Sequence, residues 1–204
     1  MVCVMAHLGT SVEYGLHCLL WLAEPGAAAA SSRDLAELQG VSPSFVAKIF
    51  PRLEKAGIVS ATPGIHGGYR LARPAAQISV LAVVDAIEGR KPLFECQEIR
   101  SRCALFKGRA PAWSTQGVCS IHAVMLRAEQ RMRDELASSS LADLAGTVAR
   151  KAPAGLDGEV RVWLGDRLQA RFKARAGDGT ARGTGKRATE TDARAARPRR
   201  RGAP

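Results

Sequence analysis

The segment from residue 31 to residue 73 constrains the fold of this chain more than any other part. SSRDLAELQG and VSPSFVAKIFPRLEKAG read as two short helices joined by a turn that contains Gly40. Two strand-like runs follow, IVSAT and YRLAR, and the PGIHGG between them is rich in turn-forming residues. Helix, turn, helix and β-hairpin in this order predict a winged helix-turn-helix. The expected fold class is therefore mainly α, with a small β-hairpin as the wing.

Local signals mark where the two helices begin. Ser31 or Ser32 can cap the first helix through its hydroxyl. Ser42 as N-cap, with Pro43 at the first helical position, gives the second helix a strong start. Pro51 lies inside the second helix, where it removes a backbone hydrogen bond and should kink the axis. The far end of that helix is therefore predicted less firmly than its beginning.

Hydrophobic periodicity and composition divide the rest of the chain. Residues 10–24 and 78–89 read as further helices of the first domain. A strongly amphipathic helix over 118–137 lies outside that domain, so its apolar stripe needs a partner, and dimerisation is the natural one. The predicted organisation is a winged helix-turn-helix DNA-binding domain (8–89), a cysteine-bearing loop (90–117), a long dimerisation helix with a short following helix (118–150), a possible extra helix (157–174) and a disordered basic tail (175–204).

The charge of the chain favours an acidic partner. The formal net charge is +11 and the pI is about 10.1, which points to nucleic acid first and to an anionic membrane second. Residues 173–204 carry +7 of that charge, so most of the excess belongs to the tail. No run reaches the roughly 18–20 apolar residues of a membrane span. We expect a cytoplasmic protein with no membrane partner, and no enzyme, because no nucleophile–base pair or phosphate loop is visible.

The second helix of the pair and the wing supply the candidate DNA contacts. In a helix-turn-helix, the N-terminal side chains of the second helix face the base edges of the major groove, and flanking cations meet phosphates. The glycines of the wing tip allow close approach to a groove or phosphate. An alternative is that the winged helix belongs to a protein-interaction adaptor or to a metalloenzyme and does not bind DNA. The candidate residues for double-stranded DNA are Ser42, Ser44, Phe45, Lys48, Arg52, His66, Gly67, Gly68 and Tyr69.

Two further groups of residues can hold a metal. Cys96, Cys103 and Cys119 lie within 24 residues, and soft thiolates select zinc, copper(I) or iron–sulfur clusters. Glu13 and His17 are four residues apart, so a helix places them on one face. From the sequence alone, Glu13 and His17 can also be explained as solvated residues of an exposed helix face, and the cysteines as inert buried thiols. His122 is a further candidate ligand, whereas Cys18 points elsewhere on its helix and is expected in the core.

The stretch from SPSFVAKIF to VVDAIEG resembles the Rrf2 family of bacterial transcription regulators. The AGIV step, the GGYRLAR wing and the VVDAIEG helix carry the resemblance, which runs from about residue 8 to residue 146. It implies a homodimer with a winged helix and a long crossing helix. VEYGLHC and FECQEIR are most similar to the redox-sensing branch of the family, in which cysteines of the loop and residues of the partner's first helix hold an iron–sulfur cluster.

The resemblance implies a specific ligand set. Cys96 and Cys119 of one subunit, with Glu13 and His17 of the other, would hold a [2Fe–2S] cluster that bridges the dimer and senses redox state. Cys103 could replace Cys96 as a ligand. In the alternative, the protein holds no cofactor and senses oxidants or electrophiles through disulfide formation among the same three cysteines.

Overall fold

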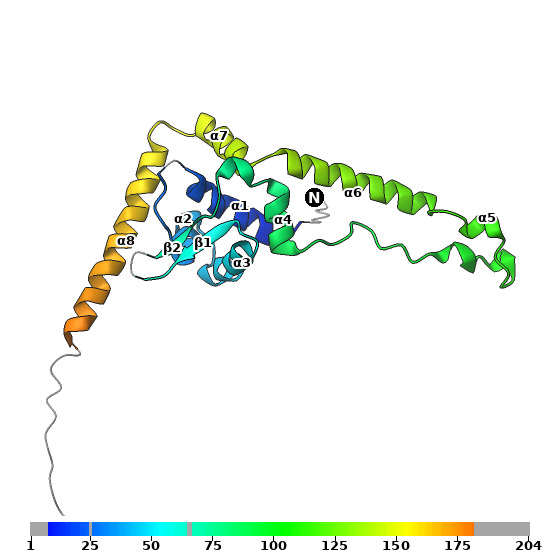
Figure 1. The fold of residues 1–204 in the computed structure, drawn as a ribbon, viewed down its shortest axis with the longest axis horizontal. Coiled ribbons are helices and arrows are strands. Elements are labelled where there is room, and N and C mark those ends of the chain that lie inside the picture. The colour runs from blue at the N-terminus through cyan, green and yellow to red at the C-terminus, as the bar shows by residue number, and fades with distance from the viewer. Residues whose placement is uncertain (1–7, 25, 65–66, 182–204) are drawn as a thin grey trace, which may run out of the picture.

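The computed structural model describes residues 8–24, 26–64 and 67–181, and gives only the backbone of residues 174–181. Figure 1 shows a small central domain with a long arm on one side and a long helix on the other. His66 and residues 182–204, on which part of the sequence prediction falls, lie outside the described residues. Among the described helices, none is long and apolar enough to cross a bilayer.

The central domain is the predicted winged helix. It contains α1 (Thr10–Ala23), α2 (Ser32–Gln39), α3 (Pro43–Lys55), α4 (Val80–Glu88), and a hairpin of β1 (Val59–Thr62) and β2 (Gly68–Leu71). The two strands are antiparallel, with Val59 opposite Leu71 and Thr62 opposite Gly68. The prediction of a mainly helical protein with a two-stranded wing is confirmed.

The helix-turn-helix begins at the caps that the sequence indicated. Ser31 accepts a hydrogen bond from the Asp34 N–H at 3.1 Å, and the Asp34 carboxylate accepts one from the Ser31 N–H at 3.3 Å. This reciprocal capping box fixes the start of α2. Helix α3 runs unbroken through Pro51. Pro51 has no N–H to donate to the Ala47 carbonyl, and both residues are exposed, so the helix tolerates the proline on its solvent side.

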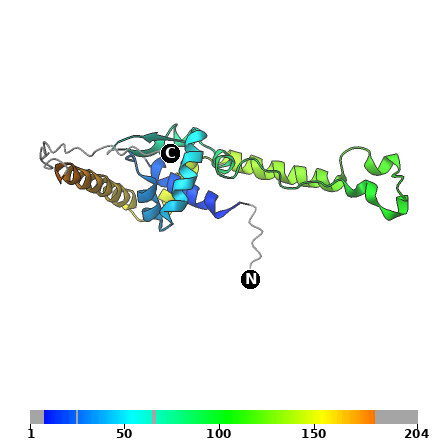
Figure 2. The ribbon, with the colours of Figure 1, turned by 90° about the horizontal axis from the view of Figure 1, so that it is seen from below.

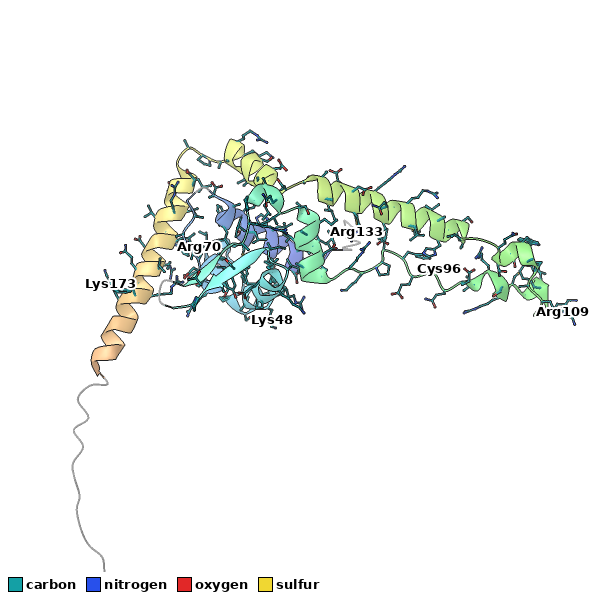
Figure 3. The ribbon with its side chains drawn as sticks, in the orientation of Figure 1. Lys48, Arg70, Cys96, Arg109, Arg133 and Lys173 are labelled. Carbon is teal, nitrogen blue, oxygen red and sulfur yellow. The ribbon has the colours of Figure 1, made fainter. Side chains whose placement is uncertain are left out.

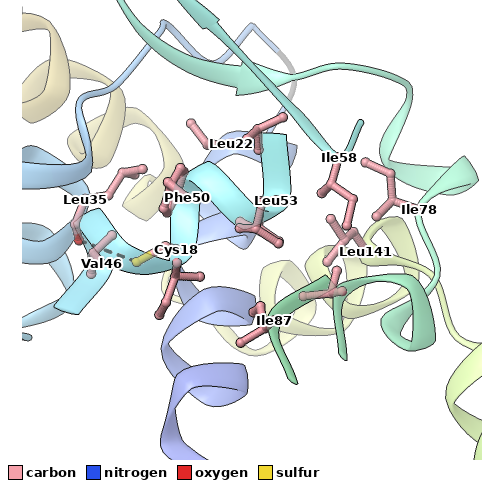
Figure 4. Packing of buried hydrophobic residues seen from close by; sticks show 14 of the residues in the cluster. Cys18, Leu22, Leu35, Val46, Phe50, Leu53, Ile58, Ile78, Ile87 and Leu141 are labelled. Atoms are coloured by element: carbon pink, nitrogen blue, oxygen red, sulfur yellow. Dashed lines mark hydrogen bonds between the residues drawn. The ribbon is translucent and has the colours of Figure 1, made fainter. Parts of the chain in front are cut away.

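The core is formed where α1, α3 and α4 meet the base of the wing. Figure 4 shows Phe50 and Leu53 of α3 packed among side chains from α1, α2 and α4 and beside Ile58, which directly precedes β1. Phe50 and Leu53 are fully buried. Their spacing with Val46 and Ile49 follows the helical period, so one apolar face of α3 is inside while its opposite face reaches solvent.

The arm consists of one long helix and the loop that leads to it. Helix α6 (Ser120–Ser138) projects away from the domain in Figures 1 and 2. The loop over 90–117 has little regular structure, with 3-10 turns η2 (Ile99–Arg102) and η3 (Ala104–Phe106) and the short helix α5 (Ala112–Thr115) at the tip. The predicted long helix therefore exists, and it begins directly after Cys119.

One ion pair fixes the base of the arm to the domain. Arg133 of α6 donates two hydrogen bonds to the Asp85 carboxylate of α4, at 3.0 and 2.7 Å. Both side chains are largely screened from water. The Val80 N–H also donates to the Ser139 carbonyl at 2.8 Å. These bonds set the direction in which α6 leaves the winged helix.

Two helices follow the arm and return to the domain. Helix α7 (Leu141–Lys151) packs on α1, and α8 (Leu156–Ala181) places Val160 and Leu164 in the core. Arg167 and Arg171 of α8 pair with Glu37 and Asp34 of α2. Helix α8 covers the segment predicted as a possible extra helix over 157–174 and continues to Ala181, seven residues into the segment predicted as a basic tail.

Replacing Phe50 by Ala should destabilise the protein by about 3–5 kcal/mol, because it leaves a cavity in the fully buried core. Urea denaturation followed by circular dichroism measures the change. The matched control is Phe106→Ala, whose ring is partly exposed and packs on Trp113 at the arm tip. An equal loss of stability in both variants would contradict the assignment of the core.

Candidate metal centre and nucleic-acid interface

The N-terminal half of α3 presents a free polar surface. Ser42, Ser44 and Lys48 are exposed, and the hydroxyls of Ser42 and Ser44 hydrogen-bond each other at 2.9 Å. The Lys48 ammonium makes no ion pair with the described residues. Two hydroxyls and one cation on the leading turns of the second helix suit contact with base edges and phosphates.

Two other predicted DNA contacts on α3 also make contacts within the protein. Phe45 is half-buried and packs edge-on against Tyr14, with 5.2 Å between ring centroids. Arg52 is exposed and donates a hydrogen bond to the Ile87 carbonyl at 2.7 Å, which ties α3 to the last turn of α4. Their contact with DNA stays a prediction, and these packing and hydrogen-bond roles add to it. Spacing along the helix cannot separate these roles, because both partners lie on other helices.

The wing glycines serve a close packing contact. A Cβ atom on Gly67 would lie 2.1 Å from the Thr62 carbonyl oxygen, and one on Gly68 would lie 2.8 Å from the Ala30 backbone. Tyr69 exchanges backbone hydrogen bonds with Ala30 and packs on Phe50. Gly67 therefore permits the tight turn within the wing, and Gly68 and Tyr69 join the wing to the segment before α2, which the sequence did not indicate.

Glu13 and His17 lie on the exposed face of α1, as the four-residue spacing predicts. They border a groove of about 610 Å³ between α1 and α7, whose walls are mostly apolar. The groove is lined by Leu8, Gly9, Thr10, Val12, Glu13, Leu16, His17, Leu20, Leu144, Thr147 and Val148. An acid and an imidazole thus stand at the edge of an open apolar surface.

Cys119 occupies a site that favours a thiolate. It is the N-cap of α6 and is 8% exposed. The N–H groups of His122 and Ile121 donate to its sulfur and lower the pKa of the Cys119 thiol, and the Arg100 guanidinium lowers it further. Cys96 is half-buried in the same arm. Arg100 donates hydrogen bonds to the loop carbonyls just before Cys119, and sequence analysis missed this arginine.

The remaining candidates differ in environment. Cys103 is exposed near the tip of the arm. His122 is half-buried on the first turn of α6, with its ring 6.0 Å from that of Phe94. Cys18 is fully buried in the core, as predicted, and burial raises the pKa of its thiol to about 12.

One copy of the chain does not bring the candidate ligands together. Among the described residues, no three potential metal ligands form a group. Glu13 and His17 belong to the central domain, whereas Figure 3 shows Cys96 out along the arm. Helix α6 has 19 residues and is therefore about 28 Å long, so its start beside Cys119 lies that far from its base on the central domain. The two halves of the predicted ligand set therefore cannot meet within one subunit.

Large apolar side chains at the start of α6 are open to solvent. Val118, just before the helix, and Ile121 and Val124 within it follow at three-residue spacing and form one apolar stripe, whereas Leu126 lies on another side; all four are between 46% and 65% exposed. A monomer rarely leaves such a stripe uncovered.

Comparison with known proteins gives a consistent result. The family model for Rrf2, described as an iron-dependent transcriptional regulator, matches residues 8–147. Protein rrf2 of Nitratidesulfovibrio vulgaris is 34% identical over 138 residues, which cover 67% of this chain and 85% of that protein. The putative transcriptional regulator YwgB of Bacillus subtilis is 27% identical over 133 residues, covering 65% of this chain and 80% of its own.

Solved structures show the same fold. CymR of B. subtilis, a global cysteine regulator, has a TM-score of 0.56 at 22% identity and is covered over 98% of its length by 70% of this chain. IscR of T. potens has the same TM-score and identity, with 96% of its length and 75% of this chain covered.

The thiols should react in the order that their environments set. Near neutral pH, a thiol reagent should modify exposed Cys103 and the thiolate-favoured Cys119 long before Cys18, because only the thiolate attacks and Cys18 stays protonated. Alkylation followed by peptide mass mapping measures the order. Unfolding in urea is the control and should expose Cys18. Equal rates at Cys18 and Cys119 in the folded protein would contradict the assignment.

Proposed function

Because this chain belongs to the Rrf2 family of transcriptional regulators, we propose that it is a homodimeric DNA-binding regulator that senses redox state through a [2Fe–2S] cluster bridging its subunits. Rrf2 regulators bind DNA and act as dimers. One observation carries the finer proposal: the acid–imidazole pair lies on α1 of the central domain and the thiol pair lies on the arm, each near an exposed apolar surface.

The apolar surfaces support an exchange of arms between two copies. The described residues of the same chain leave the stripe at the start of α6 exposed, and the groove between α1 and α7 is apolar and open. If the stripe of one subunit filled the groove of its partner, both would leave water, which is the main driving force of association. The same docking would carry the thiols of the arm toward Glu13 and His17 of the second subunit.

The donor atoms fit a cluster in their chemistry. Cys96 and Cys119 are free thiols, and Cys119 is biased toward the thiolate that binds iron. Glu13 and His17 are exposed and make no ion pair with the described residues, so their donor atoms are available. When bound, the cluster would supply a one-electron redox change, and an imidazole in place of a thiolate would raise its potential.

The residues of the chain connect the arm to the DNA-reading helix. Arg133 of α6 holds Asp85 of α4, and Arg52 of α3 holds the Ile87 carbonyl on the same α4. A change in how the arm sits on its partner would therefore act on α4 and, through it, on α3. This is how the spacing of the two recognition helices on an operator could follow the state of the arm.

A complementation experiment tests the bridging site. One subunit carries Glu13→Ala and His17→Ala, and the other carries Cys96→Ser and Cys119→Ser, with two different affinity tags. Neither variant alone should retain iron or visible absorbance after anaerobic purification. The heterodimer should hold roughly half the iron of wild type, since a symmetric dimer has two sites and one is left intact.

A wild-type heterodimer with the same tags is the control for assembly. A heterodimer that binds no iron, while the control does, would contradict ligation across the subunits. Colourless wild-type protein with no iron in aerobic and anaerobic preparations would reject the cluster itself.

The DNA surface is tested through its salt dependence. Lys48→Ala should weaken binding and reduce the slope of log affinity against log salt concentration by about 0.9 for each phosphate that the lysine neutralises. Fluorescence anisotropy with a selected operator measures both quantities. Lys151→Ala removes an equally exposed lysine at the end of α7 and should change neither. Equal effects of the two substitutions would argue against the α3 surface.

A cluster-free thiol sensor is the second candidate, and one observation favours it. Cys96 and Cys119 are free thiols on two segments of one arm that Arg100 joins by hydrogen bonds, so a two-electron oxidant would link them in a disulfide without a partner chain. This candidate requires colourless protein whose operator affinity changes with peroxide. It fails if alkylation of every accessible thiol leaves that response intact.

A further inference from the structure

We infer that Arg100 is the positioning residue of the thiol pair: it closes the loop that brings Cys96 to Cys119, and it holds a positive charge at the start of α6. The inference rests on the proposed function for the role of the two cysteines, and it names a residue that controls them.

The guanidinium of Arg100 joins the two sides of the loop. On one side it makes a bidentate ion pair with Glu98, with one of the two hydrogen bonds at 2.9 Å. On the other side it donates to the carbonyls of Gly117 at 3.0 Å, Thr115 at 3.3 Å and Gln116 at 3.5 Å. Those carbonyls lie just before Cys119, so one side chain ties the segment after Cys96 to the start of α6.

The backbone on the Cys96 side depends on the same contact. Glu98 has φ +46°, in the left-handed region that costs energy for a residue with a side chain. Its carboxylate is held by Arg100, two residues further on, so the ion pair offsets the cost of the turn. Glu98 lies two residues after Cys96 and directly before η2. Its turn therefore also sets the direction in which Cys96 points.

Arg100 also places a positive charge at the start of α6. Its side chain is 22% exposed and donates to the carbonyls just before Cys119. Its guanidinium lowers the pKa of the Cys119 thiol, whereas Glu98 raises it. Negative charge that a bound group brings to this end of α6 would therefore meet a neighbouring cation.

Only arginine can perform both roles. A guanidinium is planar, always charged and donates in several directions at once, whereas a lysine ammonium is a point charge on a flexible stem. Arg100→Lys should therefore keep much of the charge and little of the loop closure. Arg100→Met should keep neither.

The loop closure is tested on metal-free, reduced full-length protein with dibromobimane. Each thiolate displaces one bromide, so a cross-link forms only where two sulfurs lie close together. Peptide mapping should find Cys96 joined to Cys119 in the wild type. Arg100→Met and Arg100→Lys should both lower the yield on the order of tenfold, as expected when hydrogen bonds from a charged group are removed. Circular dichroism verifies that the variants are folded.

Arg109→Met is the matched control, since its side chain makes no hydrogen bond or ion pair with the described residues of the arm (Figure 3). It should cross-link like the wild type. Unchanged yield in both Arg100 variants, or an equal fall in Arg109→Met, would overturn the positioning role.

The charge is tested by the midpoint potential of the cluster-loaded protein. Arg100→Met should make the potential more negative, because the added electron then has no neighbouring cation, and Arg100→Lys should stay nearer the wild type. Equal potentials in all three would overturn the electrostatic role. If the wild type binds no cluster, the proposed function fails, and the cross-linking result still decides whether Arg100 positions the thiols.

Discussion

The ion pair between Asp85 and Arg133 is the constraint on which the rest of the molecule depends. Helix α6 has few contacts with its own domain beyond its base, so its direction is decided where Arg133 meets α4. A guanidinium with two bonds to one carboxylate fixes orientation as well as distance. Because α4 also carries the carbonyl that Arg52 of α3 contacts, the arm and the recognition helix are fastened to the same short element.

That geometry is the reason why the proposed metal centre would need two subunits. Among the described residues, the thiols of the arm do not form a ligand group with the acid and the imidazole of α1, and the apolar stripe and the groove remain open. A centre assembled from two such halves would exist only in the dimer. Association, ligand binding and operator recognition would then be linked, because each would favour the same arrangement of the two chains.

The C-terminal helix adds a feature that lies outside the matched family region. Helix α8 begins after residue 147, places apolar side chains in the core and pairs two arginines with acids of α2. One of those acids, Asp34, also closes the capping box of α2. The first helix of the helix-turn-helix is therefore held both by its own N-cap and by the last helix of the fold.

The sequence by itself determined the local elements and their chemistry. Period, caps and turn residues are properties of neighbouring positions, so Ser42–Pro43, the helix over 118–137 and the shared face of Glu13 and His17 were readable in advance. Tertiary structure alone decided which groups hydrogen-bond over long range. The Arg52 side chain bonds to α4, the Tyr69 backbone to Ala30, and the Arg100 side chain to the carbonyls before Cys119. Each of these contacts joins residues that are distant in sequence, and their choice of partner depends on how the helices pack, which no local pattern contains.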